Sequence, residues 1–167
     1  MHLSALLPTA LGNFTLAIDE VGLCALSFPE EIVPATVSAT RVDINSHPLL
    51  DEAGHQLLAY LNGSLHCFDL PLSIHGTPFR LQVWQQLLTI PYGQTRTYGE
   101  LATLIGGRHK ARAVGGAAHA NPLAIFIPCH RLIGTNGKLT GFGGGLTMKQ
   151  VLLELEGSTI RNMKKVT

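Results

Sequence analysis

The sequence has little cysteine and little charge, and both shortages limit what the protein can be. Three cysteines with no regular spacing argue against a disulfide-stabilised scaffold and favour a reducing compartment, the cytoplasm. Charged residues make up 14% and the net charge is +1, so any contact with DNA must come from a local arrangement. The chain lacks a signal-peptide pattern and any apolar run near the roughly 20 residues that span a membrane. We therefore expect a soluble protein without a membrane partner.

Apolar residues make up 46% of the chain, which is enough for a buried core, and the pattern changes near residue 76. Before this point we expect two strands joined by a turn, a further short strand, and an amphipathic helix. After it we expect four helices separated by segments that contain proline or glycine. The strands are predicted at residues 14–18, 23–28 and 41–44, and the helices at residues 49–61, 79–89, 98–105, 110–120 and 146–155.

These elements predict an α+β protein. Residues 1–76 form a small α/β supporting domain with a short antiparallel sheet. Residues 77–167 form a mainly helical domain with a winged-helix-like helix-turn-helix, in which residues 110–120 are the recognition helix. Residues 123–127 are a buried apolar run, and the residues able to carry chemistry lie in this second domain.

Cys129 and His130 are neighbours in the sequence and form the first candidate for catalysis. A nucleophilic cysteine reacts as its thiolate, so it needs a base or positive surroundings. His130 can accept the thiol proton directly or through one water, and a carboxylate can orient it. A Cys-His pair alone is more often structural than catalytic, and we expect Cys24 and Cys67 to be structural.

Glu156 is the carboxylate expected to point toward this pair. In a helical projection of the last helix it falls beside the buried stripe, whereas Glu154 falls on the polar side. The stripe is predicted to contain Met148, Val151, Leu152 and Leu155.

The helix at residues 110–120 contains two adjacent glycines, which cost roughly 1 kcal/mol each against alanine. Two interpretations remain open: close approach of this helix to a bulky anionic partner such as DNA in a narrow groove, or tight packing against another helix. The projection places Ala113, Val114, Ala117 and Ala120 on one side and Arg112, Gly115, Gly116 and His119 on the other.

The second half of the sequence closely resembles the O6-alkylguanine-DNA alkyltransferases, also called methylated-DNA–protein-cysteine methyltransferases. Several motifs match in the same order, and the first half fits more loosely through Leu11-Gly12 and the helix before Gly63. The matching runs are Phe79 to Trp84, Ile90 to Gly93, Arg112 to Ala117, Asn121-Pro122, Ile127 to Arg131, Gly141 to Gly145, and Leu152 to Gly157.

The resemblance implies that Cys129 accepts an alkyl group irreversibly from O6-alkylguanine, and also from O4-methylthymine, once per molecule. His130 would act through a water as the base, oriented by Glu156. Tyr98 would rotate the 3′ phosphate outward and protonate the departing guanine. Asn121 would hold the turn between the recognition helix and the active-site strand. The base must be flipped out because an enzyme cannot reach it inside a duplex.

The resemblance also implies a monomer that needs no cofactor and binds double-stranded DNA through the minor groove. Arg112 would enter the duplex in place of the flipped nucleotide. The other residues expected at the DNA are Gly115, Gly116, His119, Thr97 and Thr135. The residues expected to line the base pocket are Phe142, Gly143, Leu132 and Ala124.

Two positions depart from common family members. Phe142 stands where many have tyrosine, so a backbone donor such as that of Gly143 would have to serve the base, and Ala124 stands where some vertebrate members have proline. We therefore expect weaker reaction with bulky free bases such as benzylguanine than vertebrate members show. No metal site is expected, because His2 and Cys24 are too sparse to form one.

Two other functions remain to be weighed. An alkyltransferase-like protein could flip the damaged base without accepting the alkyl group, but the acceptor cysteine is replaced in such relatives and is present here. A Cys-His hydrolase would need an oxyanion hole, and it would leave the helix-turn-helix without a purpose.

Overall fold

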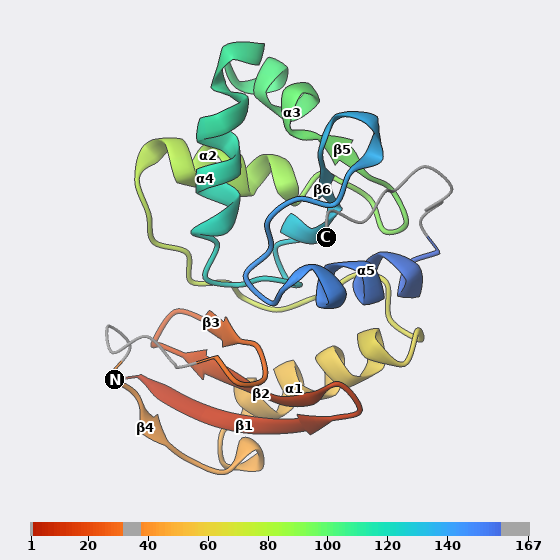
Figure 1. Cartoon of the computed structure of the whole chain (residues 1–167). Coiled ribbons are helices and arrows are strands. Elements are labelled where there is room, and N and C mark those ends of the chain that lie inside the picture. Colours follow the sequence, from red (N-terminus) through yellow and green to blue (C-terminus); the bar gives the residue numbers. More distant parts are fainter. Residues whose placement is uncertain (1, 32–37, 158–167) are drawn as a thin grey trace. The chain divides into compact units, whose positions relative to one another are not determined.

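The computed structural model describes residues 2–31 and 38–157 and divides into two compact units, Met1–Ile74 and His75–Thr167 (Figure 1). A four-stranded sheet with one long helix makes up the first unit, and the second is mainly helical. The expected α+β class is therefore confirmed. In the described part of the chain, no helix is both long enough and apolar enough to cross a membrane.

The sheet of the first unit has the strand order β3-β2-β1-β4. Its central antiparallel pair joins β1 to β2, with Leu3 opposite Ile18 and Pro8 opposite Asn13, and β4 adds to β1 in parallel. Strand β1 was not predicted, because Pro8 interrupts its apolar pattern; Pro8 lies next to the turn, near the end of the pairing. The strands are β1 (Leu3–Thr9), β2 (Gly12–Ile18), β3 (Leu23–Ser27) and β4 (Thr40–Arg41).

The further short strand expected at residues 41–44 is present, but its bounds are wrong, since it lies at Thr40–Arg41. The edge strand β4 ends at Arg41, and Ile44–Ser46 form the short 3-10 helix η1. Two residues of β4 pair with β1, too few to show an alternating apolar pattern in the sequence.

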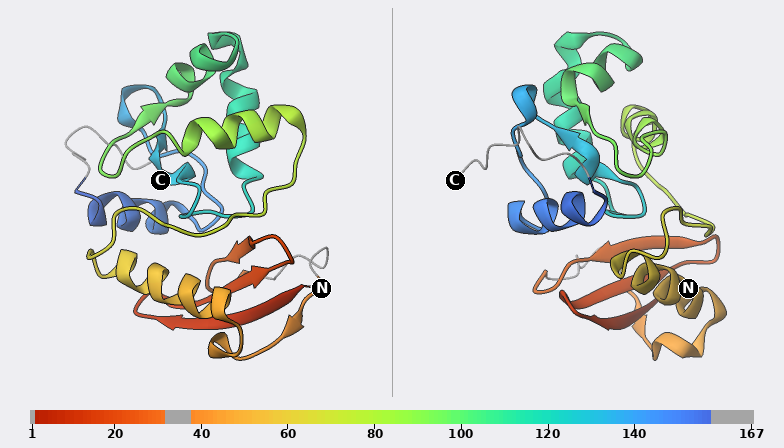
Figure 2. Two further views of the ribbon diagram at one scale, coloured as in Figure 1. Left: turned by 180° about the vertical axis from the view of Figure 1, so that it is seen from behind. Right: turned by 90° about the vertical axis from the view of Figure 1, so that its right-hand side faces the viewer.

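Helix α1 (Pro48–Leu61) lies against one face of this sheet (Figure 2). Pro48 occupies its first position, where a missing N–H costs nothing, and His47 Nδ1 accepts a hydrogen bond from the Leu49 amide. Gly54 permits close packing, since a Cβ there would lie 3.2 Å from Cγ1 of Ile44. The buried residues of the helix are Leu50, Ala53, Gly54, Leu57 and Tyr60.

Over residues 75–157, the described part of the second unit, there are four α-helices, and α3 and α4 form the expected helix-turn-helix (Figure 1). Gly106 and Gly107 end α3 with φ values of 144° and 140°, which favour glycine, and the short 3-10 helix η2 (Arg108–Lys110) leads into α4. The helices are α2 (Pro78–Leu87), α3 (Tyr98–Ile105), α4 (Ala111–His119) and α5 (Leu146–Leu155), and two parallel strands, β5 (Arg96–Thr97) and β6 (Leu132–Ile133), complete the unit.

Helix α4 turns a slightly different face to the core than the projection predicts. Val114, Ala117 and Ala118 are buried, whereas Ala113, which was expected on the inner side, is exposed. Helix α2 covers part of this buried face. The opposite face of α4 is left to solvent.

Candidate active site

Cys129 begins the short 3-10 helix η3 (Cys129–Arg131) and is 7% exposed. The preceding residues 123–127 are buried, as predicted, and form turns with one isolated bridge between Ala124 and Ile127. Asn121 spans this turn, since its Oδ1 accepts from the Leu123 amide at 2.9 Å and its Nδ2 donates to the Ile127 carbonyl at 2.8 Å. Ile125 within it has φ 75°, a costly conformation for a β-branched residue. The turn therefore holds Cys129 in a fixed place.

The thiol of Cys129 is protonated at rest. Burial raises its pKa, and the Asn121 amide and the Lys149 ammonium oppose this shift. Because the thiolate is the nucleophile, the site must supply a base when substrate binds.

His130 is completely buried, and its Nε2 lies 2.8 Å from Oε1 of Glu156. Glu156 follows the last residue of α5 and is itself 5% exposed, so it points inward as predicted. Burial lowers the pKa of His130, and the hydrogen bond and charge of Glu156 oppose this shift. The neutral imidazole can donate its Nε2 proton to Glu156 and keep Nδ1 as the basic nitrogen.

Arg131 also binds Glu156, and the sequence analysis did not assign it a role. Its Nε lies 3.0 Å from Oε2 and its Nη2 lies 2.8 Å from Oε1, while Nη1 donates to the carbonyl of Ile90 at 2.6 Å. The only signal in the sequence is its position directly after the Cys-His pair. A buried Arg–carboxylate pair with two parallel hydrogen bonds is strong and directional.

Lys149 is a second buried cation that the sequence analysis missed. Its Nζ donates to the carbonyl of Thr140 at 2.9 Å and lies 5.9 Å from the centre of the Tyr98 ring. Burial lowers its pKa from 10.5 to about 8, with the opposing influence of Cys129. A buried lysine whose pKa lies near 8 is unusual, and strongly shifted pKa values of this kind are concentrated at functional sites.

The buried face of α5 differs from the predicted stripe. Met148, Val151 and Leu155 are half-buried, so three of the four predicted positions lie at the margin of the core. The face that the fold covers is rotated from the predicted stripe and includes Lys149, which was not among the predicted residues. The side chains that face the core are Lys149, Leu152, Leu153 and Glu156.

Tyr98 borders a pocket of about 580 Å³ on the outer side of α4. Its hydroxyl donates to the Thr140 carbonyl at 3.4 Å, so Tyr98 and Lys149 share one acceptor. Burial raises the pKa of Tyr98, which keeps its proton available as a donor. The pocket is lined by Tyr98, Ala111, Arg112, Gly115, His119, Thr140 and Gly141.

The glycines of α4 distinguish between the two interpretations left open by the sequence. A Cβ on Gly116 would meet nothing within 4 Å, and one on Gly115 would lie 3.7 Å from Cε1 of Tyr98, an ordinary contact. Packing inside the protein therefore does not require glycine at either position. Arg112 and His119 are exposed on the same face, which favours approach of an external partner.

The remaining predicted residues lie outside the buried network. Thr97 caps α3: its hydroxyl accepts from the Glu100 amide at 3.1 Å, and the Glu100 carboxylate accepts from the Thr97 amide at 2.8 Å. Thr135 is exposed in the short 3-10 helix η4 (Thr135–Gly137). For the expected base pocket, Leu132 is fully buried, Ala124 is 8% exposed, Phe142 is half-buried and Gly143 is exposed.

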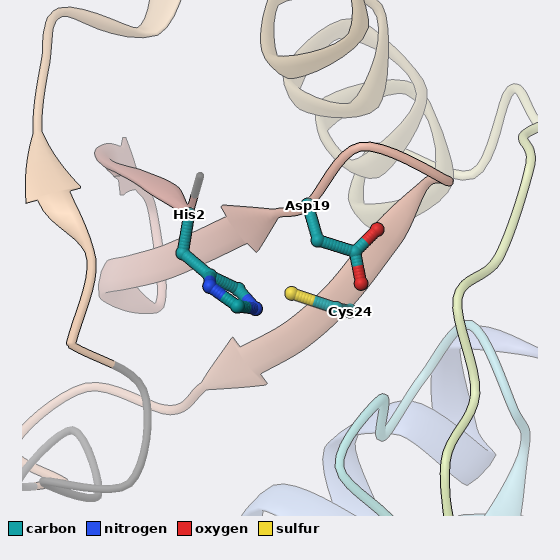
Figure 3. Close-up of side chains that lie close together, drawn as sticks. All are labelled: His2, Asp19 and Cys24. Carbon is teal, nitrogen blue, oxygen red and sulfur yellow. The ribbon is translucent and has the colours of Figure 1, made fainter.

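In the first unit, His2, Asp19 and Cys24 each bring one potential ligand atom within 4.8 Å of the others (Figure 3). His2 and Cys24 were expected to be too sparse for a metal site, but the fold brings them together with Asp19. Both carboxylate oxygens of Asp19 already accept hydrogen bonds, from the Val21 amide and the Ser73 hydroxyl among others. Burial raises the pKa of Cys24 to about 11, so a cation would have to displace its proton.

Both units match models of one protein family. Residues 3–74 match the 6-O-methylguanine DNA methyltransferase, ribonuclease-like domain, and residues 78–158 match the 6-O-methylguanine DNA methyltransferase, DNA binding domain. The two matches cover both units of the structure in the same order.

Full-length relatives are also similar. A methylated-DNA–protein-cysteine methyltransferase of Methanosarcina acetivorans is 46% identical over 154 residues, covering 92% of this chain and 97% of the relative. One of Mycolicibacterium paratuberculosis is 57% identical over 147 residues, covering 87% of each chain. The crystal structure of Mycobacterium tuberculosis OGT in complex with DNA has a TM-score of 0.84 and 44% identity, covering 92% of each chain.

Proposed function

The chain belongs to the O6-methylguanine DNA methyltransferase family and is a methylated-DNA–protein-cysteine methyltransferase that repairs O6-methylguanine in DNA directly, and we propose that Cys129 is its alkyl acceptor. One observation carries this proposal. Cys129 is held in a buried turn directly before His130, whose Nε2 lies 2.8 Å from the Glu156 carboxylate. Neither Cys24 nor Cys67 has a buried histidine–carboxylate pair beside it among the described residues.

The proposed reaction moves one alkyl group and one proton. His130 takes the thiol proton, through a water, and the Cys129 sulfur attacks the alkyl carbon. A carbon–sulfur bond forms, the carbon–oxygen bond breaks, and its electron pair remains on the guanine. Tyr98 donates its proton to the leaving base and is reprotonated from His130, so in net terms one proton passes from the thiol to guanine. The thioether has no easy route back to the thiolate, so each molecule reacts once.

The protein binds DNA. We propose that it does so as a monomer on the minor groove of a duplex, with α4 against the groove. The exposed Gly116 lets backbone approach closely, and Arg112 fills the gap left by the flipped nucleotide. The pocket of about 580 Å³ beside Tyr98 lies on this same face and would receive the base or its phosphate. O4-methylthymine is a further proposed substrate.

Mass spectrometry of the intact protein and its peptides tests the acceptor. After incubation with a duplex that carries O6-methylguanine, we expect the Cys129 peptide to gain one methylene, and the peptides of Cys24 and Cys67 to stay unchanged. Cys129→Ser should show no gain, whereas Cys67→Ser, at an exposed position, should react fully.

Binding without transfer is the alternative outcome. If the wild-type chain retards the damaged duplex but no peptide gains mass, the protein recognises the lesion without accepting the alkyl group. Methylation of a cysteine other than Cys129 would also refute the proposed acceptor.

A further inference from the structure

Glu156 serves two residues at once. Its Oε1 accepts from His130 Nε2 at 2.8 Å and from Arg131 Nη2 at 2.8 Å, and its Oε2 accepts from Arg131 Nε at 3.0 Å. The Gly93 amide adds a long hydrogen bond to Oε2 at 3.4 Å. All three side chains are buried, so water does not screen these charges.

The partner of a buried carboxylate decides the protonation of the histidine beside it. A carboxylate whose only neighbour is an imidazole favours the charged form of that imidazole, because the lone buried negative charge is costly. An arginine that remains charged can satisfy the same carboxylate without taking a proton from solution. The imidazole can then stay neutral.

We propose that Arg131 is a positioning residue that keeps Glu156 ionised and correctly oriented, and so leaves His130 neutral and able to accept the proton of Cys129. This inference rests on the proposed role of Cys129 and deepens it by adding a fourth member to the buried network. Arg131 itself is anchored from the other side, since its Nη1 donates to the Ile90 carbonyl at 2.6 Å and its guanidinium lies 5.9 Å from the Tyr92 ring centre.

The charged groups around His130 shift its pKa in opposite directions. Burial and the charges of Arg131 and Lys149 lower the pKa of His130, and Glu156 raises it. Tyr92 borders the Arg131–Glu156 pair: Glu156 raises the pKa of its hydroxyl and Arg131 lowers it. Cys129 lies on the same short helix as His130. Loss of Arg131 should therefore raise the pKa of His130, and loss of the Glu156 charge should lower it.

A raised pKa of His130 affects the pH dependence of the reaction in the same way whether the shared proton lies on the Cys129 sulfur or on the His130 ring during attack. The neutral thiol with a neutral imidazole and the thiolate with an imidazolium contain the same number of protons. Both forms are lost when a second proton binds at low pH. A raised pKa of His130 therefore moves the acid limb of the pH–rate profile to higher pH.

The proposal predicts that removing Arg131 and removing the charge of Glu156 shift the pKa of His130 in opposite directions. We would measure the pH titration of the His130 Cε1 proton by NMR and the single-turnover rate of methyl transfer from pH 5 to 9. For Arg131→Met we expect the titration and the acid limb to move to higher pH, with a rate loss about tenfold larger at pH 6 than at pH 8. For Glu156→Gln we expect the titration to move to lower pH. Arg131→Lys should restore part of the wild-type behaviour.

The double variant Arg131→Met/Glu156→Gln is the matched control, because it removes both charges together. Its His130 titration should fall between those of the two single variants. If both single variants move the titration in the same direction, or neither moves it, Arg131 has only a structural role and the proposal fails. If Arg131→Met does not fold, Arg131→Gln, which removes the charge but keeps a hydrogen-bond donor, takes its place in the contrast with Glu156→Gln.

A failure of the proposed role of Cys129 can be distinguished from a failure of the proposed role of Arg131. The NMR titration needs no DNA and no transfer, so it reports on Arg131 even if the alkyl group were found on another residue. Conversely, Cys129 could gain the methylene in every variant while the His130 titration stays unmoved, which would overturn the role of Arg131 alone.

Discussion

The indole Nε1 of Trp84 in α2 donates a 2.8 Å hydrogen bond to the carbonyl oxygen of Ala117 in α4. Ala117 lies in the last turn of α4, where carbonyl groups have no partner within the helix. Trp84 is 2% exposed, so both groups are paired away from water. Helix α2 therefore caps the helix that is proposed to contact DNA.

Replacing Trp84 by phenylalanine should leave the Ala117 carbonyl buried and unpaired. We expect the free energy of unfolding to fall by between about 1 and 3 kcal/mol, measured by urea denaturation. Affinity for duplex DNA should fall as well, because the end of α4 is no longer held. An unchanged unfolding curve would show that the hydrogen bond contributes nothing.

Gly116→Ala should change stability and DNA binding in opposite directions. The added methyl group meets no atom within 4 Å, so the better helix propensity of alanine should stabilise the protein by about 1 kcal/mol. If DNA approaches this face, the same methyl should weaken binding several-fold in a fluorescence anisotropy titration. Unweakened binding together with raised stability would argue against α4 as the contact surface.

Arg112→Ala should separate base flipping from chemistry. Arg112 is exposed on the face of α4 that borders the Tyr98 pocket. We expect transfer from O6-methylguanine in a duplex to slow by at least about tenfold, since the gap left by the flipped base is no longer filled. Reaction with the free alkylated base should be unaffected. Arg96→Ala, which removes a hydrogen bond to Thr89 outside this pocket, serves as the control.

Lys149 should give the protein an unusual rise in stability at alkaline pH. Its pKa falls from 10.5 to about 8 on folding, so between these values the unfolded chain binds a proton that the folded chain has released. Stability therefore increases with pH across this window, by up to about 3 kcal/mol. Below pH 8 both states carry the charge and the contribution of this group no longer changes.

The comparison that isolates this effect is Lys149→Met, with both proteins in a Cys129→Ser background. The raised pKa of Cys24, about 11, makes both proteins less stable as the pH rises above 9. This effect is the same with and without Lys149, so the difference between their two curves of unfolding free energy against pH reports on Lys149. Parallel curves from pH 7 to 10.5 would show that the lysine is not perturbed by burial.

Local patterns predicted most of the helices. Turn and capping residues such as Pro48, Gly106 and Gly107 bracket segments whose apolar spacing is regular, so α1, α3, α4 and α5 were found to within about two residues. Helix α2 was extended too far, to Thr89 in place of Leu87. The strand β1 and the exact edge of β4 were missed, because their pairing depends on partners elsewhere in the chain.

The sequence by itself determined the candidate pair, because Cys129 and His130 are neighbours in it and their motif is present before any folding. Only the tertiary structure decided what surrounds them. Glu156 meets His130 across 26 positions, and two cations, Arg131 and Lys149, are buried within the same unit. A helical projection gives the relative faces of a helix but not which face the rest of the fold will cover. A buried lysine is stable only where a carbonyl such as that of Thr140 receives it, and that carbonyl is supplied by folding.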